Sequence, residues 1–360
     1  MLCRLDSSCH GTKCSLESAG GVLLKRSRSG LEHLIRVACL LIAVVMALFL
    51  LYQGGRWLER RSEKPEPRGD HTQRYAFEDL VEIDGVTYRQ RTGLTTILLM
   101  GIDRESGTAS AQGYRNGGQA DFLRLLVIDD VNKTVTQIQI DRDTMTPITV
   151  LGVLGNKSGV RTAQICLSHG FGDGKAQSCE LTVEAVSNLM FGIPIDFYVA
   201  LNMDGISVLN DALGGVTVTL EDDFSALDPG MTKGTTLTLV GDQAEIYVRS
   251  RMNVGIGTNE ARMARQELYI SQVASLLLEQ MEIDEDFVSS MYDTLSPYLL
   301  TDIPRGRLIN EAWTAKDYDR NAAVKPDGTH EVGNDGFMQF HVAETALRSI
   351  VIDLFFEEVK

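Results

Sequence analysis

The chain has 360 residues, of which 44% are hydrophobic and 23% charged, and its formal net charge is −15. That size suits one large domain or two small ones with appendages, and the composition is that of a globular protein with a sizeable core. Residues 1–68 hold 11 basic and 6 acidic side chains, so the rest of the chain is strongly acidic. Nucleic-acid binding requires a basic footprint, so no nucleic-acid partner is expected.

An apolar stretch lies near the N-terminus. Residues 37–52 carry no charge, and Leu34 and Ile35 extend the stretch past Arg36, whose long side chain can reach the interface. A helix of about 20 apolar residues spans a bilayer, so we expect one uncleaved transmembrane anchor over residues 34–55. A cleaved signal peptide is the alternative, but this core is long for one and no small-residue cleavage site follows it.

The orientation of the anchor depends on the cysteines, because basic residues flank both of its ends and leave the positive-inside rule nearly neutral. Four cysteines lie before or inside the anchor and two lie after it: Cys3, Cys9, Cys14, Cys39, Cys166 and Cys179. We read the early thiols as reduced and cytoplasmic. This predicts a single-pass cell-membrane protein with residues 1–33 in the cytoplasm and the large domain outside. Cys166 and Cys179 could then form a disulfide or remain unpaired thiols.

Three further segments are expected after the anchor: a polar, proline-containing linker over 56–90, a main folded domain over 91–283 and an extension over 284–360 that packs on the domain. Apolar runs and alternating patterns predict strands at 95–102, 122–128, 134–140, 195–201 and 216–220. Periodic apolar residues predict helices at 180–191, 204–213, 259–281 and 343–356. Strands that alternate with helices indicate an α/β fold.

Charged residues gather at the ends of the first three predicted strands. Asp103 ends the first strand, Asp121 begins the second, and Arg142 follows the third. If the second strand is antiparallel to the other two, these three residues share one edge of the sheet, where α/β proteins bind ligands. Two carboxylates together with phosphate oxygens make a suitable Mg²⁺ shell. The alternative is that each aspartate only caps a turn or a helix.

A second basic cluster precedes and begins the longest predicted helix. Arg249 and Arg251 share a face if the chain there is extended, and Arg262, Arg265 and Gln266 share one face of the helix. A cation near a helix N-terminus costs roughly 0.3–1 kcal/mol, which a bound anion such as phosphate would offset. The alternative is a solvated helix face that pairs with neighbouring glutamates.

Seven segments together carry a family resemblance. They are ILLMGIDR, ADFLRLLVID, IQIDRDT, GIPIDFYVALNMDGI, LNDALGGVTV, IYVRSR and ARMARQ. In this order and spacing, from about residue 95 to residue 274, the chain resembles the LytR-CpsA-Psr (LCP) family of bacterial cell-envelope phosphotransferases. The resemblance implies an α/β fold in which a mixed sheet is layered between helices, outside the membrane and behind one N-terminal transmembrane helix.

The resemblance also implies an activity, namely transfer of a glycan phosphate from a polyprenyl-pyrophosphate-linked precursor to a peptidoglycan acceptor. Asp103, Asp121 and Arg142 would be the catalytic residues, and the two aspartates would hold Mg²⁺ or Mn²⁺. An apolar groove between sheet and helices would take the lipid tail. The residues expected at the pyrophosphate are Arg142, Arg249, Arg251, Arg262 and Gln266, with Arg265 from the same helix face.

Two positions depart from the family pattern. Gln119 stands where an arginine is frequent, for which Arg115 or Arg124 could substitute, and Asn259 stands where an aspartate is usual. The long, glycine-rich segment between Asp103 and Asp121 could form a lid. The departures favour one alternative, a non-catalytic envelope scaffold or regulator that binds lipid pyrophosphates. A polyprenyl pyrophosphatase, which would share the site but need no acceptor groove, is the other alternative. The sequence does not specify the glycan, the acceptor or the oligomeric state.

Overall fold

The computed structural model describes residues 80–83, 85–103, 117–152, 155–251, 254–255 and 257–359. The predicted cytoplasmic segment, the predicted anchor at 34–55, most of the predicted linker and Arg115 lie outside these ranges. Among the helices of the described ranges, none is long and apolar enough to cross a bilayer.

A six-stranded mixed sheet forms the centre of the fold, with the strand order β11-β8-β3-β4-β5-β12. Its strands are β3 (Leu94–Ile102), β4 (Ala120–Asp129), β5 (Thr134–Ile140), β8 (Phe197–Asn202), β11 (Leu299–Thr301) and β12 (Asp319–Arg320). β4 is antiparallel to β3 and to β5, while β8 is parallel to β3. The predicted mixed α/β fold is therefore confirmed, and so is the antiparallel second strand.

The turn between β4 and β5 is built by the carboxylate of Asp129. This carboxylate accepts hydrogen bonds from the backbone amides of Val131 and Asn132, at 2.9 and 2.8 Å. Lys133 completes the turn with φ = 56°. The hairpin aligns the two strands so that the end of β3, the start of β4 and the end of β5 meet at one edge of the sheet.

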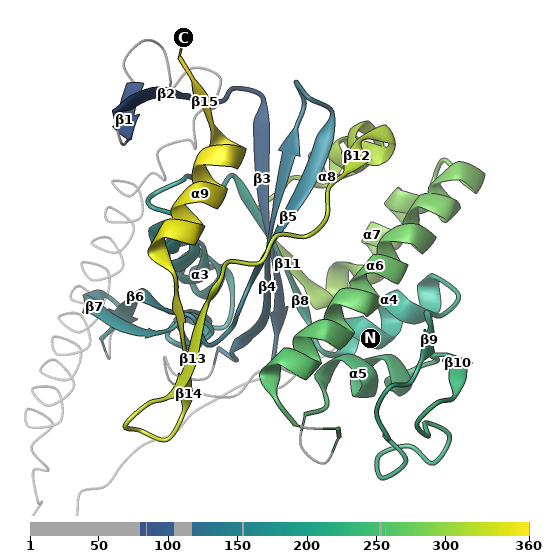
Figure 1. The fold of residues 1–360 in the computed structure, drawn as a ribbon. Helices are drawn as coiled ribbons and strands as arrows, with labels where there is room; N and C mark the ends of the chain where they lie inside the picture. The colour runs from purple at the N-terminus through teal and green to yellow at the C-terminus, as the bar shows by residue number, and fades with distance from the viewer. Residues whose placement is uncertain are drawn as a thin grey trace, which may run out of the picture. The chain divides into compact units, whose positions relative to one another are not determined.

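One face of the sheet carries the largest core. Alternate residues of β3 and β4, such as Leu98, Met100, Leu123 and Leu125, pack there against α3 (Ala176–Leu189) and α9 (Glu344–Phe355). Figure 1 shows these two helices on the same side of the sheet. The hairpin of β6 (Met145–Leu151) and β7 (Lys157–Gln164) and the short α2 (Leu167–Gly170) complete this side.

The other face is covered by α6 (Asn259–Ile283) and its neighbours, as Figure 1 shows. α6 begins where the Thr258 hydroxyl accepts from the backbone amide of Ala261, which is a standard N-terminal cap. The neighbours are α4 (Asp204–Ala212), α5 (Asp242–Arg249), α7 (Phe287–Leu295), α8 (Arg305–Thr314), β9 (Thr217–Thr219), β10 (Thr236–Thr238) and the 3-10 turns η1 (Ser296–Tyr298) and η2 (Ala315–Asp317).

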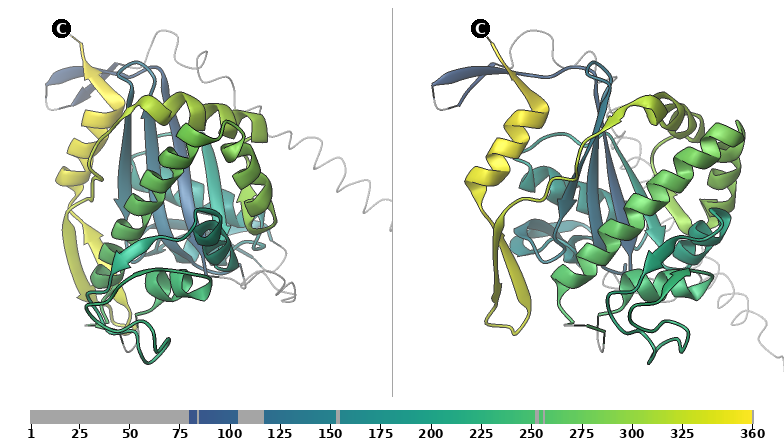
Figure 2. Two further views of the ribbon diagram at one scale, coloured as in Figure 1. Left: turned by 90° about the vertical axis from the view of Figure 1, so that its right-hand side faces the viewer. Right: turned by 45° about the vertical axis from the view of Figure 1, so that its right-hand side comes forward.

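The residues after α6 are part of the same fold as the central sheet. They supply β11 and β12 to the central sheet, and then form the hairpin of β13 (Gly328–Val332) and β14 (Met338–Val342). Both views of Figure 2 place this hairpin at the same end of the fold as the start of α6. β15 (Phe356–Glu358) pairs with β2 (Val86–Gln90), which pairs with β1 (Leu80–Ile83), so the last residues expected in the linker are structured.

Candidate functional site

The carboxylate of Asp121 lies between two guanidinium groups. Arg142 Nη1 is 2.6 Å from Asp121 Oδ1, and Arg262 Nη1 is 3.5 Å from Asp121 Oδ2. Asp121 is the second residue of β4, Arg142 follows β5, and Arg262 is in the first turn of α6. The structure therefore brings the strand-end residues and the helix residue together, as the predicted topology required.

Asp103 joins the same sheet edge through β3. Its backbone amide donates to the Gln119 carbonyl at 2.8 Å, and its Oδ1 accepts from Arg249 Nη2 at 2.9 Å. Arg249 is the last residue of α5, where the helix dipole favours a cation. The chain becomes extended at the next residue, Ser250. Arg249 and Arg251 thus do not share one strand face, although the charge of Arg251 still acts on Asp121.

Arg142 is held by neutral side chains as well as by Asp121. Its Nη2 donates to Gln119 Oε1 and to Cys166 Sγ, the latter at 3.3 Å. Gln119 is one of the two departures from the family pattern, and here it accepts a hydrogen bond, which an arginine at that position would be unable to do. Gln119 therefore positions Arg142.

Cys166 and Cys179 are both free and buried, so they are not joined in a disulfide. Cys179 Sγ instead lies 3.8 Å from His169 Nε2. Burial raises the pKa of the Cys166 thiol to about 12, so this group donates or accepts weakly as a neutral thiol.

Arg265 does not join the anion cluster, which corrects the expectation from its spacing. Its Nε donates to the Tyr247 carbonyl at 3.2 Å, its Nη1 to Asp222 Oδ2 at 3.0 Å, and its Nη2 to the Ser250 carbonyl. These backbone acceptors lie in the last turn of α5 and just after it, where carbonyls lack partners within the helix. Arg265 therefore holds the end of the helix that carries Arg249.

Gln266 also binds the end of α5, since its Nε2 donates to the Val248 carbonyl at 3.1 Å. Arg124, a candidate substitute for the missing arginine, is 1% exposed and donates to Gln137 and Glu267 on the α6 side of the sheet. It therefore lies apart from the strand-end cluster. Both side chains serve the packing of α6 in this structure.

Burial shifts the pKa values of the charged groups at this site. Burial raises the pKa of Asp121, while Arg142 and Arg262 act in the opposite direction and Asp103 adds to the rise. Burial lowers the pKa of Arg262. Within the described residues, the buried Nε of Arg262 has no hydrogen-bond partner, and the Nε of Arg142 makes no hydrogen bond but lies 3.4 Å from Asp143 Oδ1. An anion that accepts from these donors would satisfy them, which is the behaviour expected of a phosphate site.

Asp103 and Asp121 fit a magnesium site only as a partial shell. Within the described part of the chain, no group of three or more histidine, cysteine, aspartate or glutamate side chains could hold a metal ion. Mg²⁺ takes few protein ligands and keeps waters or phosphate oxygens, so two carboxylates at the sheet edge are chemically sufficient. Asp121 Oδ1 is 2.6 Å from Arg142 Nη1, so a metal ion at this site would share that oxygen with the guanidinium.

An apolar cavity of about 500 Å³ lies beside this cluster, between the sheet and helices α4, α6 and α7. Four of the lining residues are close in sequence to site residues: Gly101, Phe122, Val248 and Gln266. Deeper lining residues such as Leu126, Val273 and Met291 are apolar. The resemblance alone predicted this groove, because apolar spacing does not distinguish a filled core from a hollow one.

Asn259, the second departure, and His330 belong to the network behind Arg262. Asn259 Oδ1 accepts from Arg262 Nη2 at 2.7 Å, and Asn259 Nδ2 donates to Asp141 Oδ1 at 2.9 Å. His330 Nε2 lies 2.9 Å from Asp141 Oδ2. The sequence gives no local signal for His330, since it lies far along the chain from Asp141 in a hairpin without a recognisable motif.

Comparison with known proteins places this geometry in a family. The family model described as LytR_cpsA_psr family matches residues 61–351. A Halalkalibacterium halodurans protein named polyisoprenyl-teichoic acid--peptidoglycan teichoic acid transferase TagU is 31% identical over 182 residues, which are 50% of this chain and 53% of that protein. The chain thus spans about half the length of the curated relatives it matches.

Two solved structures share the fold. Protein gbs0355 from Streptococcus agalactiae matches with a TM-score of 0.60 and 21% identity, over 73% of this chain and 87% of that one. TagT bound to LI-WTA matches with a TM-score of 0.55 and 21% identity, over 73% of this chain and 90% of that one. The match of the family model over most of the chain shows that this protein belongs to the LytR-CpsA-Psr family.

Proposed function

We propose that this protein is a Mg²⁺-assisted phosphotransferase of the cell envelope. It transfers a glycan phosphate from a polyprenyl-pyrophosphate-linked precursor to a peptidoglycan acceptor. The observation that carries the proposal is the position of the Arg142–Asp121–Arg262 cluster next to the apolar cavity. A lipid pyrophosphate has the same two parts, a compact anion and a long apolar chain.

The relatives support the class of substrate. The Halalkalibacterium halodurans relative is named polyisoprenyl-teichoic acid--peptidoglycan teichoic acid transferase TagU, and one solved structure with the same fold is TagT bound to LI-WTA. Under the proposal, the anchor at residues 34–55 ties the chain to the cell membrane, with the N-terminus in the cytoplasm. The catalytic domain then lies outside, where peptidoglycan is found.

In the proposed reaction, an acceptor hydroxyl oxygen attacks the phosphorus that carries the glycan. The anhydride P–O bond breaks, and polyprenyl phosphate leaves with the electron pair. Arg142 and Arg262 neutralise the charge on the phosphate oxygens, with Arg249 and Arg251 at the rim. The proton of the attacking hydroxyl moves to a carboxylate oxygen of Asp103 or Asp121.

Asp103 and Asp121 would hold the Mg²⁺ ion, which would supply charge neutralisation at the pyrophosphate oxygens. The raised pKa of Asp121 suits a group that takes up a proton, and its burial keeps water away from the reacting atoms. Gln119 and Asn259 orient Arg142 and Arg262 by accepting hydrogen bonds from them. The departures from the family pattern thus leave both arginines in place at the site.

The test uses the full-length chain in detergent, with a polyprenyl-pyrophosphate-linked glycan and Mg²⁺, in the presence and absence of peptidoglycan fragments. Transfer predicts acceptor-dependent release of polyprenyl phosphate that is lost in Arg142→Ala. Equal release without acceptor would instead identify a pyrophosphatase. Tight binding without release under either condition would identify a lipid-pyrophosphate-binding scaffold or regulator.

A further inference from the structure

We propose that His330, on the C-terminal β13–β14 hairpin, is a positioning residue that orients Arg262 for the pyrophosphate through Asp141 and Asn259. The inference rests on the proposed function, because Arg262 is the group that would touch the substrate. It adds the C-terminal hairpin to the site.

The contacts form one continuous path. His330 Nε2 is 2.9 Å from Asp141 Oδ2, Asn259 Nδ2 donates to Asp141 Oδ1 at 2.9 Å, and Asn259 Oδ1 accepts from Arg262 Nη2 at 2.7 Å. The partners fix the amide of Asn259, since its nitrogen faces a carboxylate and its oxygen faces a guanidinium. A flip of this amide would break both contacts.

The residues that connect His330 to the site are buried, which strengthens the hydrogen bonds between them. Asp141 is 2% exposed, Asn259 7% and Arg262 5%. Hydrogen bonds among such groups are stronger than in water and polarise one another. The negative charge of Asp141 draws the amide hydrogens of Asn259 towards it, which makes the amide oxygen a better acceptor for Arg262.

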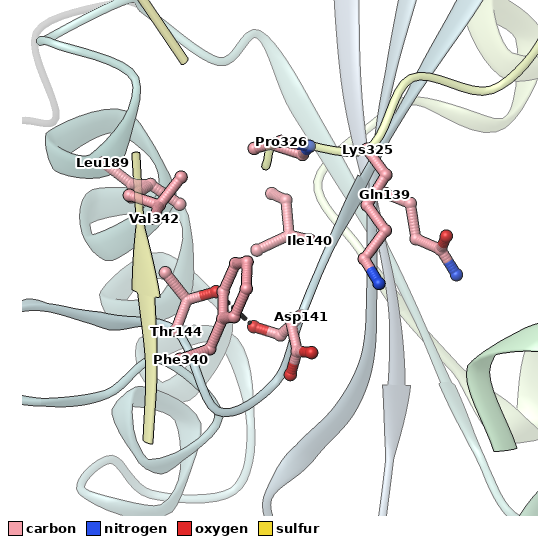
Figure 3. A pocket seen from close by; sticks show the side chains of 9 residues that line it. All are labelled: Gln139, Ile140, Asp141, Thr144, Leu189, Lys325, Pro326, Phe340 and Val342. Carbon is pink, nitrogen blue, oxygen red and sulfur yellow. Dashed lines mark hydrogen bonds between the residues drawn. The ribbon is translucent and has the colours of Figure 1, made fainter. Parts of the chain in front are cut away.

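The hairpin is built so that His330 faces Asp141. His330 pairs with Phe340 across the two strands, and the two rings lie 4.6 Å apart. The backbone amide of Phe340 donates to the Asp143 carbonyl at 2.8 Å, which fixes the hairpin to the end of β5. Figure 3 shows Phe340 beside Thr144, whose hydroxyl donates to the Asp141 carbonyl at 2.6 Å.

Two carboxylates and one ring face the imidazole. Asp141, after β5, lies at Nε2; Glu260, on α6, lies 3.4 Å from Nδ1; and Phe340, on β14, packs on the ring. The contact with Asp141 requires a proton on Nε2, so that this nitrogen donates. His330 thereby links the hairpin to α6 as well as to the strand end.

The same geometry explains why an amide stands at position 259. An aspartate there would place a second carboxylate about 2.9 Å from that of Asp141, and two such groups cannot both ionise without a large cost. The two positions are therefore coupled. Exchanging the two residues would again place one amide opposite one carboxylate, while the backbone amide of Asp143, which donates to Asp141 Oδ1 at 2.9 Å, would lose its acceptor.

The first experiment compares His330→Phe, which keeps the ring packing on Phe340, with His330→Gln, which keeps a donor for Asp141. The full-length chain in detergent is assayed for kcat and KM in transfer and for its affinity for inorganic pyrophosphate with Mg²⁺. We expect His330→Phe to lose about tenfold in kcat/KM, the scale of one lost hydrogen bond to a charged group, and His330→Gln to recover most of it. His341→Gln, on β14 and paired with Glu331, is the matched control and is expected to behave as the parent protein.

The second experiment separates positioning from stability. Asn259→Asp is expected to lose more than tenfold in pyrophosphate affinity, and the exchange Asp141→Asn with Asn259→Asp is expected to recover at least half of that loss on a logarithmic scale. If these residues have a purely structural role, the pyrophosphate affinity of each variant will fall only as far as its melting temperature falls.

The outcomes for the two proposals differ. If transfer proceeds and His330→Phe equals the parent protein in both kcat/KM and pyrophosphate affinity, the positioning inference is wrong and the proposed function stands. If pyrophosphate binding depends on His330, and the exchange restores the affinity that Asn259→Asp loses, while no transfer occurs, the inference stands and the proposed function is wrong.

Discussion

Arg249 Nη2 lies 2.9 Å from Asp103 Oδ1, so this carboxylate, like that of Asp121, is already paired with a cation. Under the proposed function, a metal ion and Arg249 would compete for the oxygen atoms of Asp103 until a substrate anion drew the guanidinium away. The side chains of Arg249 and Asp103 are 47% and 41% exposed, so the pair is weak enough to exchange.

This competition gives the first prediction. Arg249→Met should raise the affinity for Mg²⁺ in the absence of pyrophosphate by a fewfold, since Asp103 is then free, and lower the affinity for Mg²⁺–pyrophosphate by roughly fivefold to tenfold. Isothermal titration with each ligand measures both effects. Parallel changes of the two affinities would show that Arg249 does not compete with the metal ion. Arg348→Met, on α9 and paired with Glu344, is a surface control.

The second prediction concerns Arg265, which we expect to act on stability and not on the anion. Arg265→Met leaves Asp222 without its guanidinium and the end of α5 without its donors, at a cost of roughly 3 kcal/mol in the free energy of unfolding. Arg262→Met should instead abolish pyrophosphate binding with a smaller stability loss. Urea unfolding and pyrophosphate titration of both variants decide the question, and a reversed pattern would return Arg265 to the site.

The third prediction follows from the pKa of Asp121, which burial raises above its ordinary value of 3.8. The folded protein then holds this proton more tightly than the unfolded chain, so stability falls as the pH rises from 3.8 through the raised pKa. Asp143 contributes in the same direction. Asp121→Asn should flatten this part of the profile, measured by urea midpoints from about pH 4 to pH 7. An unchanged slope would show that Asp121 has an ordinary pKa.

The fourth prediction tests the apolar cavity. Ala274 lines the cavity on α6, whereas the next residue, Ser275, is exposed and donates to the Ser271 carbonyl. Ala274→Phe should fill part of the space and weaken binding of a polyprenyl pyrophosphate by tenfold or more, because a displaced lipid segment loses its burial. Binding of inorganic pyrophosphate should stay the same. Ser275→Phe adds the same ring outside the cavity, and an equal loss in this control would argue against a lipid site.

The fifth prediction concerns the two thiols of the described domain. Cys166 and Cys179 are free and buried, and burial raises the pKa of each to about 12, so both should resist alkylation in the folded protein and react fully on unfolding. Mass spectrometry of protein alkylated before and after unfolding, without reductant, counts the thiols. Two unreactive cysteines after unfolding would reveal a disulfide.

The strand-end cluster could be predicted from the sequence because it depends on local signals. The apolar runs at 95–102 and 122–128 predict two strands, and the short turn at 129–133 supports the pairing of the second strand with the third. If the three strands are neighbours, this arrangement brings Asp103, Asp121 and Arg142 to one edge. Each strand and helix predicted from these patterns is observed within a few residues of its predicted bounds. Strands of this kind can be predicted from apolar runs and from the alternation of apolar and polar residues in neighbouring segments of the sequence.

The partners of the helix residues could not be predicted, because they depend on how α5 and α6 pack. Spacing placed Arg262, Arg265 and Gln266 on one face, but that face meets both the anion cluster and the end of α5. The link from His330 to Asp141 joins two distant segments with no pattern between them. Tertiary contacts of this kind become visible only in the folded structure.

The measurement that tests the central claim most directly is the mass of the acceptor after incubation of the full-length protein with a glycan-labelled polyprenyl pyrophosphate, Mg²⁺ and peptidoglycan fragments. The proposed function predicts a peptidoglycan fragment heavier by one glycan phosphate, formed together with polyprenyl phosphate and absent with Arg262→Met. Unmodified peptidoglycan beside a bound, intact lipid would contradict it.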